Sequence, residues 1–133
     1  MPTDYARLAA GPIFAAVLLA AAPAQAPDPI AQAEPGAWRL RDLGGGETVS
    51  MCVSDPHQLL QVRHRGLSCR REPIESDTSH ATVRYVCPSG NGRTSVTVET
   101  RQLVRIRTQG VDKGAPFDFD YEARRVGPCG RGA

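Results

Sequence analysis

The sequence has four cysteines but no C-x-x-C pair. Zinc ribbons and thioredoxin-like redox sites need cysteines at that short spacing, so both classes are excluded. A glycine cluster at 44–46 is not followed by Gly-Lys-Ser or Gly-Lys-Thr, which excludes a phosphate-binding loop. Lysine is scarce, with Lys113 the only one, and the formal net charge is +2. Nucleic-acid-binding domains carry a clear excess of positive charge, which this chain lacks, so we expect no nucleic-acid partner.

Residues 1–24 have the layout of a cleavable secretory signal peptide. A polar start ending at Arg7 precedes an apolar run from Ile13 to Ala22, and Ala22-Pro23-Ala24 follows. Signal peptidase reads small residues at the first and third of those positions, so we expect cleavage after Ala24.

The alternative to a cleaved signal is a retained membrane anchor. Residues 8–27 carry no charge over nearly the length of a membrane-spanning helix. Pro12 and Pro23 interrupt that stretch, which favours the cleaved signal. In both cases we expect an exported domain, periplasmic or secreted, and no stable membrane insertion once the signal is removed.

The segment 25–35 is rich in proline and alanine, so we expect a disordered or extended linker. The folding unit is then 36–130, a single exported domain. A core of that size is marginal and benefits from covalent cross-links. Four cysteines in a short exported chain predict two disulfides.

Alternating apolar and polar residues predict strands along most of this domain. Ser54, Asp55 and Pro56 are typical of a helix start, and Gly66 is typical of its end, so one short helix is expected through about His64. The expected fold is mainly β, an antiparallel, strongly twisted meander or half-open barrel of about seven strands with one short helix. The expected strands cover 37–43, 47–53, 67–75, 81–87, 94–99, 103–109 and 117–126.

The apolar faces of the last four strands predict a register. Neighbouring strands are paired through the shortest loops that keep the apolar residues together. On the opposite face this register puts Arg107 across from Asp118 and Arg105 across from Asp120. The two apolar rows are Val83, Val96, Ile106 and Phe119, and Ala81, Val98, Val104 and Tyr121.

The face of the sheet on which each cysteine lies also limits which disulfides can form. Cys52 alternates with inward residues and so faces out, and Cys69 faces out if Ile74 faces in, whereas Cys87 lies on an inner row. Cysteines on opposite faces cannot bridge, which favours Cys52–Cys69 together with Cys87–Cys129. The alternative is Cys69–Cys87 with Cys52–Cys129, because four cysteines allow three connectivities.

Candidate reactive residues each have a simpler interpretation. His57, His64 and His80 are expected to be solvent-exposed, and the first two lie too far apart on a helix to share a metal ion. Ser54, Asp55 and His57 have the residue types of a catalytic triad but lie at a helix cap. We therefore expect no catalytic, metal or cofactor site, and no enzymatic activity. Asp118 and Asp120 are expected to form salt pairs with the arginines opposite them.

Two features of the sequence are candidates for a binding surface. Arg63, Arg65, Arg70 and Arg71 form the densest basic cluster, diluted by acidic residues that follow, so a mixed solvated surface is expected. A curled sheet with one apolar face often encloses a small ligand. The lining of such an apolar cavity would be Trp38, Val83, Tyr85, Val96 and Phe119.

Several elements together resemble a proteobacterial family, the domain-of-unknown-function family 3617. They are a signal peptide, G-x-W at Gly36 and Trp38, Cys-Val-Ser-Asp-Pro at 52–56, the next two cysteines, and Ala-Arg-Arg-Val-Gly-Pro-Cys at 123–129. The resemblance covers about 36–129 and implies a small exported protein, with no functional residue to carry over. G-x-W is also similar to the start of lipocalins, but this domain is short for one and lacks their later motifs.

The sequence thus predicts a periplasmic binding or interaction module without catalysis. Its partner is unknown, and a small apolar ligand or an envelope protein are both consistent with the pattern. The alternative is a structural or envelope accessory protein that binds no small ligand.

Overall fold

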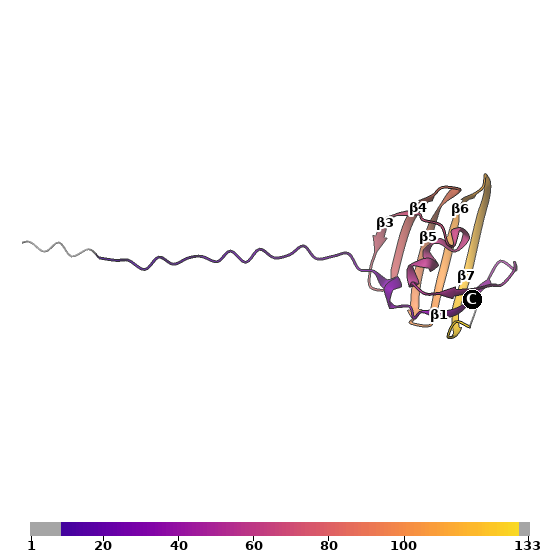
Figure 1. The fold of residues 1–133 in the computed structure, drawn as a ribbon, viewed down its shortest axis with the longest axis horizontal. Helices are drawn as coiled ribbons and strands as arrows, with labels where there is room; N and C mark the ends of the chain where they lie inside the picture. The colour runs from indigo at the N-terminus through magenta and orange to yellow at the C-terminus, as the bar shows by residue number, and fades with distance from the viewer. Residues whose placement is uncertain (1–8, 131–133) are drawn as a thin grey trace, which may run out of the picture.

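The computed structural model describes residues 9–130, and the first eight residues of the expected signal lie outside that range. Residues 9–27 contain no helix or strand, are exposed, and lead away from the folded domain (Figure 1). Within the described residues, no helix has the length and apolar character needed to cross a bilayer.

The fold is a single open antiparallel sheet of seven strands, which confirms the predicted mainly β architecture. The sheet does not close, and its strand order is β2-β1-β7-β6-β5-β4-β3. Two 3-10 helices accompany it, η1 (Pro29–Gln32) and η2 (Pro56–His64). The strands are β1 (Gly36–Asp42), β2 (Val49–Val53), β3 (Arg70–Ser76), β4 (His80–Cys87), β5 (Gly90–Thr100), β6 (Leu103–Asp112) and β7 (Ala115–Gly127).

The chain order explains how the apolar face is covered. Strands β3 to β7 form a meander of hairpins, and β1 pairs with both β2 and β7. The connection from β2 at one edge to β3 at the other therefore runs across the sheet. That connection is η2, which lies in front of the strands in Figure 1. Its Leu59, Leu60 and Val62 are buried in the core.

The predicted inner face of the meander is correct, but parts of the register are wrong by two residues. The observed row is Ala81, Val96, Ile106 and Tyr121. The predicted row has Val83 in place of Ala81 and Phe119 in place of Tyr121. The strands run on into two-residue turns at Pro88-Ser89 and Lys113-Gly114. Positive φ at both residues of the second turn matches the twist of a tight hairpin, so the strands extend further than expected.

The shift also changes the charged face. Arg107 lies opposite Asp120 and Arg105 opposite Glu122, whereas Asp118 lies opposite Gln109. Within the described residues, Asp118 and Asp120 take part in no ion pair, so the expected salt pairs are wrong.

The next inner row, which contains Val83 and Phe119, carries two threonines. Thr94 and Thr108 are fully buried, and their hydroxyl oxygens lie 2.9 Å apart. Each hydroxyl satisfies the other, as buried polar groups require.

The disulfides are Cys52–Cys129 and Cys69–Cys87, so the favoured pairing is wrong and its alternative is correct. The parity argument failed at a β-bulge. Ile74 is an extra residue between Pro73 and Glu75 in the β3–β4 ladder, which reverses the faces of everything before it. Cys69 therefore lies opposite Cys87. Cys52 faces away from the core as predicted, and Ala37 pairs with both Cys52 and Gly127, which brings Cys129 within reach.

The expected linker is part of the folded domain. Ile30 and Ala33 are only 1% and 3% exposed. Gln32 Nε2 donates to the Thr78 carbonyl at 3.0 Å, and the Glu34 backbone N–H donates to the Arg101 carbonyl at 2.8 Å. The folded unit thus begins near Asp28 and not at Gly36, because a single isoleucine within a proline- and alanine-rich stretch fills the end of the core.

We expect Ile30→Ala to lower the free energy of unfolding by about 2–4 kcal/mol, because it empties a fully buried site. Ile74→Ala, at a residue 41% exposed, is the matched control and should cost less than about 1 kcal/mol. Urea denaturation of both variants measures the difference. Equal small losses would show that η1 is not part of the core.

We expect the two disulfides to contribute unequally, since they close loops of 77 and 18 residues. Chain-entropy arithmetic gives about 4.5 kcal/mol for the long loop and about 3 kcal/mol for the short one. The paired variants Cys52→Ser/Cys129→Ser and Cys69→Ser/Cys87→Ser test this by urea denaturation. Peptide mapping of the unreduced protein checks the pairing itself, and a Cys52–Cys69 peptide would contradict the structure.

Candidate functional site

The five side chains expected to line one cavity lie in the core or against it, and they do not surround a common space. Trp38, Val83, Tyr85 and Val96 are at most 7% exposed, and Phe119 packs against the same core. The described hollows that Trp38, Val83 and Val96 border are three different ones. Residues of η1 and η2 fill the apolar face of the sheet instead.

His57 is held between two carboxylates. Its Nδ1 lies 2.7 Å from Asp55 Oδ1 and its Nε2 lies 2.8 Å from Asp28 Oδ2. Partial burial by itself lowers the pKa of His57, but the hydrogen bonds and charges of Asp28 and Asp55 outweigh it and raise that pKa. The pKa of Asp55 is lowered, mainly because its carboxylate accepts the His57 backbone N–H. This bridge ties η1 to η2.

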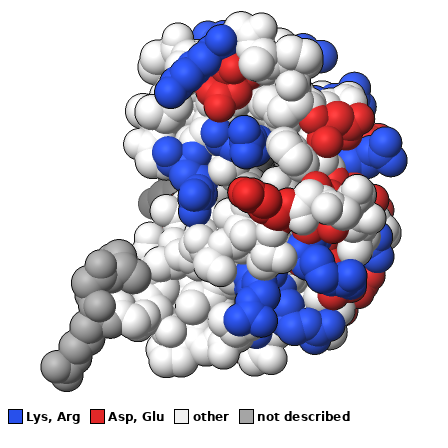
Figure 2. All heavy atoms as spheres, turned by 90° about the vertical axis from the view of Figure 1, so that its right-hand side faces the viewer, with Lys and Arg blue, Asp and Glu red and all other residues white. Residues whose placement is uncertain are grey.

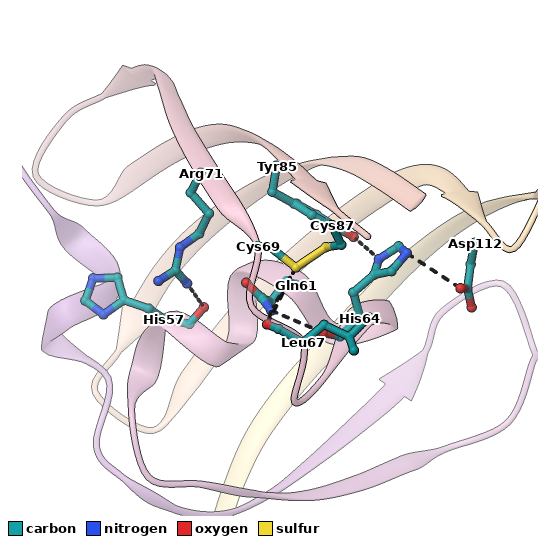
Figure 3. Close-up of a disulfide and its surroundings, with 9 residues drawn as sticks. All are labelled: His57, Gln61, His64, Leu67, Cys69, Arg71, Tyr85, Cys87 and Asp112. Atoms are coloured by element: carbon teal, nitrogen blue, oxygen red, sulfur yellow. Dashed lines mark hydrogen bonds and ion pairs between the residues drawn. A yellow bond between two sulfur atoms is a disulfide. The ribbon is translucent and has the colours of Figure 1, made fainter. Parts of the chain in front are cut away.

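His64 is buried, so its expected solvent exposure is wrong. Its Nδ1 lies 2.9 Å from the Tyr85 hydroxyl, and its Nε2 lies 3.6 Å from Asp112 Oδ1 (Figure 3). Burial raises the pKa of Tyr85. Beside this network, the Gln61 side-chain amide donates to the Leu67 and His64 carbonyls and to Cys69 Sγ. These contacts anchor the end of η2 to the Cys69–Cys87 disulfide.

Glycines in β5 provide the space for this network, and they are the sequence signal that could have revealed it. A Cβ at Gly90 would meet His64 Nε2 at 2.7 Å, and one at Gly92 would meet the Tyr85 ring at 2.5 Å. Glycine within a strand indicates such a close approach. Alternation predicts strands at 81–87 and 94–99 with a loop at 90–93 between them, so the prediction misses this signal.

Ser54, Asp55 and His57 are not arranged as a catalytic triad. The ring nitrogen of His57 that would face a serine faces Asp28, and Ser54 is bonded through its backbone to Gln58. His80 is exposed and uses the same Nδ1 for both Ser79 and Asp77. A relay needs the two opposite ring nitrogens. Within the described residues, no three His, Cys, Asp or Glu side chains cluster closely enough to hold a metal ion.

The largest described hollow is a groove of about 640 Å³ between η2 and the edge strand β2. This volume lies within the range of small-ligand sites. We call it the η2–β2 groove. It is lined by Val49, Met51, Cys52, Gln58, Gln61, Val62, Arg63, Arg65 and Gly66.

Two guanidinium groups supply the positive charge of the groove. Arg63 lies over the rings of Phe119 and Phe117, at 5.0 and 5.9 Å from their centroids. Arg65 Nη1 donates to the Ser50 carbonyl at 3.4 Å. Among the described residues, neither arginine has a carboxylate partner.

Arg63 of the groove lies over aromatic residues of β7 that pack toward the core. Phe117, Phe119 and Tyr121 stack along the strand, with ring centroids 6.2 and 5.4 Å apart. Burial raises the pKa of Tyr121, and the nearby charges of Arg63 and Arg65 oppose that shift. The two guanidiniums therefore lie close to the end of an aromatic stack.

The basic cluster expected from the sequence is divided in the structure. Arg71 lies apart from the groove and donates to the His57 carbonyl at 2.9 Å, and Arg70 is exposed on β3. Basic and acidic residues are interspersed over the face drawn in Figure 2. Of the four arginines, only Arg63 and Arg65 line the groove.

A second hollow of about 280 Å³ lies beside His57 and is lined mostly by apolar residues, among them Ile30, Leu60 and Val83. Its histidine is already bonded to two carboxylates. The η2–β2 groove is the larger of the two, and its two arginines have no carboxylate partner among the described residues, which makes it the candidate binding site.

No family model matches the sequence, and neither a curated protein nor a solved structure matches it.

We expect the Asp28–His57–Asp55 bridge to stabilise the fold at low pH. A histidine with a raised pKa contributes fully below its ordinary value, and the contribution is lost as the pH rises through the folded-state pKa. His57→Gln should therefore destabilise the protein more at about pH 5.5 than at about pH 8.5, by less than about 1 kcal/mol because the pair is partly exposed. Urea denaturation at both pH values measures this, with His80→Gln as control. An equal loss at both would contradict the assignment.

Proposed function

We propose that this protein is an exported, non-catalytic binding module whose ligand site is the η2–β2 groove. The observation that carries the proposal is the pair of guanidiniums, Arg63 and Arg65, beside an apolar floor of Val49, Met51 and Val62. A ligand that fits has a negatively charged group together with an apolar part.

Export is supported from two sides. Residues 1–24 have the layout of a signal peptide, and cleavage after Ala24 would leave the first anchoring residue, Asp28, in place against His57. Two disulfides are typical of an oxidising compartment. The periplasm, and membership of the domain-of-unknown-function family 3617, remain parts of the proposal.

The electrostatics of the groove support an anionic ligand. Arginine forms planar, charge-assisted hydrogen bonds with carboxylates and phosphates. Arg63 is held over Phe119 and Arg65 over the β2 edge, so both are positioned before a ligand arrives. Groups that need no reordering on binding lose less entropy.

The contacts of the histidines support the absence of catalysis. His57 is bonded to two carboxylates and His64 to Tyr85, so neither meets a serine or a thiol. Both disulfides occupy all four cysteines.

The alternative is a structural or envelope accessory protein without a small ligand. The observation in its favour is the filled core: η2 and Ile30 occupy the apolar face of the sheet that a ligand would otherwise enter. In that case the groove is a surface feature only.

We expect the anionic apolar dye anilinonaphthalene sulfonate to bind the folded protein at one site. Arg63→Glu/Arg65→Glu should weaken that binding about tenfold to a hundredfold, because two charge-assisted contacts are replaced by repulsion. Arg70→Glu/Arg93→Glu makes the same change in net charge at exposed positions outside the groove and should leave binding unchanged. Dye fluorescence titration measures the affinities.

Near-ultraviolet circular dichroism of Trp38 shows that each variant is folded, since partly folded states also bind the dye. Dye binding that both double variants retain, or an unmodified protein that binds no dye, would favour the accessory protein.

A further inference from the structure

We propose that the occupant of the η2–β2 groove is an extended acidic polypeptide segment that adds to the sheet as a strand beside β2. This inference rests on the proposed function and names its partner. Peptide recognition by strand addition uses main-chain hydrogen bonds for affinity and side chains for specificity.

The two free edges of the sheet differ in protection. An open edge strand is a template for pairing, and proteins block it with charges, proline or bulges. The β3 edge has all three, since Arg70-Arg71-Glu72-Pro73 and Glu75 surround a bulge at Ile74. Every residue of this strand is exposed or half-buried, so its sequence is not required by the core.

The β2 strand itself has none of these devices, although Arg65, just past the end of η2, reaches its edge from outside. Its sequence, Val49-Ser50-Met51-Cys52-Val53, contains no charge and no proline, and its pairing with β1 is regular. Arg65 donates to the Ser50 carbonyl, so that carbonyl points away from β1. Because backbone groups alternate along an antiparallel strand, the N–H and C=O of Cys52 point the same way. The edge therefore offers the N–H groups of Ser50 and Cys52 and the Cys52 carbonyl, and a strand that pairs there would share or displace Arg65 at the Ser50 carbonyl.

The groove lies along this same edge. Val49 and Met51 form its floor on the inner side of β2, and η2 with Arg63 and Arg65 forms its opposite wall. A strand added beside β2 would place alternate side chains over that floor. Side chains facing the guanidiniums would meet two positive charges that have no carboxylate partner in the part of the chain that the structure describes, which favours glutamate or aspartate.

Seven-residue peptides with blocked ends test the proposal. The first alternates valine and glutamate, the second alternates valine and lysine, and two further versions of the first carry N-methyl groups on its odd or on its even residues. Strand addition uses only one edge of the peptide, so one N-methylated version should bind like the parent. The other should bind at least about tenfold more weakly, because the methyl groups remove its donors toward β2. Isothermal titration calorimetry with the purified protein measures each affinity.

Protein variants test the same contact from the other side. Ser50→Pro removes an N–H that points away from β1, and proline is tolerated at an edge strand there. It should weaken the valine–glutamate peptide about tenfold more than it weakens anilinonaphthalene sulfonate, because only the peptide uses the Ser50 N–H. Arg63→Glu/Arg65→Glu should weaken the peptide and strengthen the valine–lysine peptide, whereas Arg70→Glu/Arg93→Glu should alter neither. Near-ultraviolet circular dichroism confirms folding.

Equal binding of the two N-methylated peptides would overturn strand addition. So would a peptide that does not bind while the dye still binds through Arg63 and Arg65, and in that case the proposed function stands. If the unmodified protein binds neither the dye nor the peptide, the proposed function is overturned as well. Sedimentation velocity measures whether the protein forms a dimer. A dimer that Ser50→Pro dissociates would show that β2 of a second copy occupies this edge, and not an acidic segment of another protein.

Discussion

One constraint organises the molecule: an open sheet has an apolar face that must be covered, and this chain has little with which to cover it. The sheet order sends the chain from the β2 edge to the β3 edge, so the crossing segment η2 serves as the cover. Its Leu59, Leu60 and Val62 fill the middle of the face, and Ile30 of η1 fills the end that η2 does not reach. The segment before β1 is therefore structural, although its composition is that of a linker.

A cover of nine residues needs to be held in place, and the polar network does this. A 3-10 helix is a weak element by itself. Asp55 and Gln58 form a reciprocal cap at its start, and Gln61 secures its end beside the Cys69–Cys87 disulfide. His64 then reaches into the sheet to Tyr85, through space that glycines leave open. Buried polar groups are costly unless they have partners, and the Gln61 amide and His64 Nδ1 have theirs, whereas His64 Nε2 lies 3.6 Å from Asp112 and makes no hydrogen bond to a described residue. Here they fix where the cover lies, and so they fix one wall of the groove.

The sequence predicted the elements of this fold better than their connections. Alternation along 117–126 was sufficient for the strands and for their inner faces, because a sheet with one wet face has a strict period of two. Register and disulfide pairing depended on single residues that alternation does not reveal: the positive φ of Lys113 and the extra residue Ile74. The groove was not predictable, since it depends on where η2 rests against β2, and that position follows from His64 and Cys69. Four arginines form the basic cluster, and the positions of η2 and β3 decide that only Arg63 and Arg65 line the groove.

The groove lies where the cover ends. The residues of η2 in the hydrophobic core are Leu59, Leu60 and Val62, whereas Gln58, Gln61, Arg63 and, just past its end, Arg65 line the groove toward β2. Arg63 places its guanidinium over the ring of Phe119, so the charge that a ligand would meet also covers part of the apolar face. The side chain that closes the core is also the one that a ligand would meet, so folding and binding share the same few contacts in this small domain.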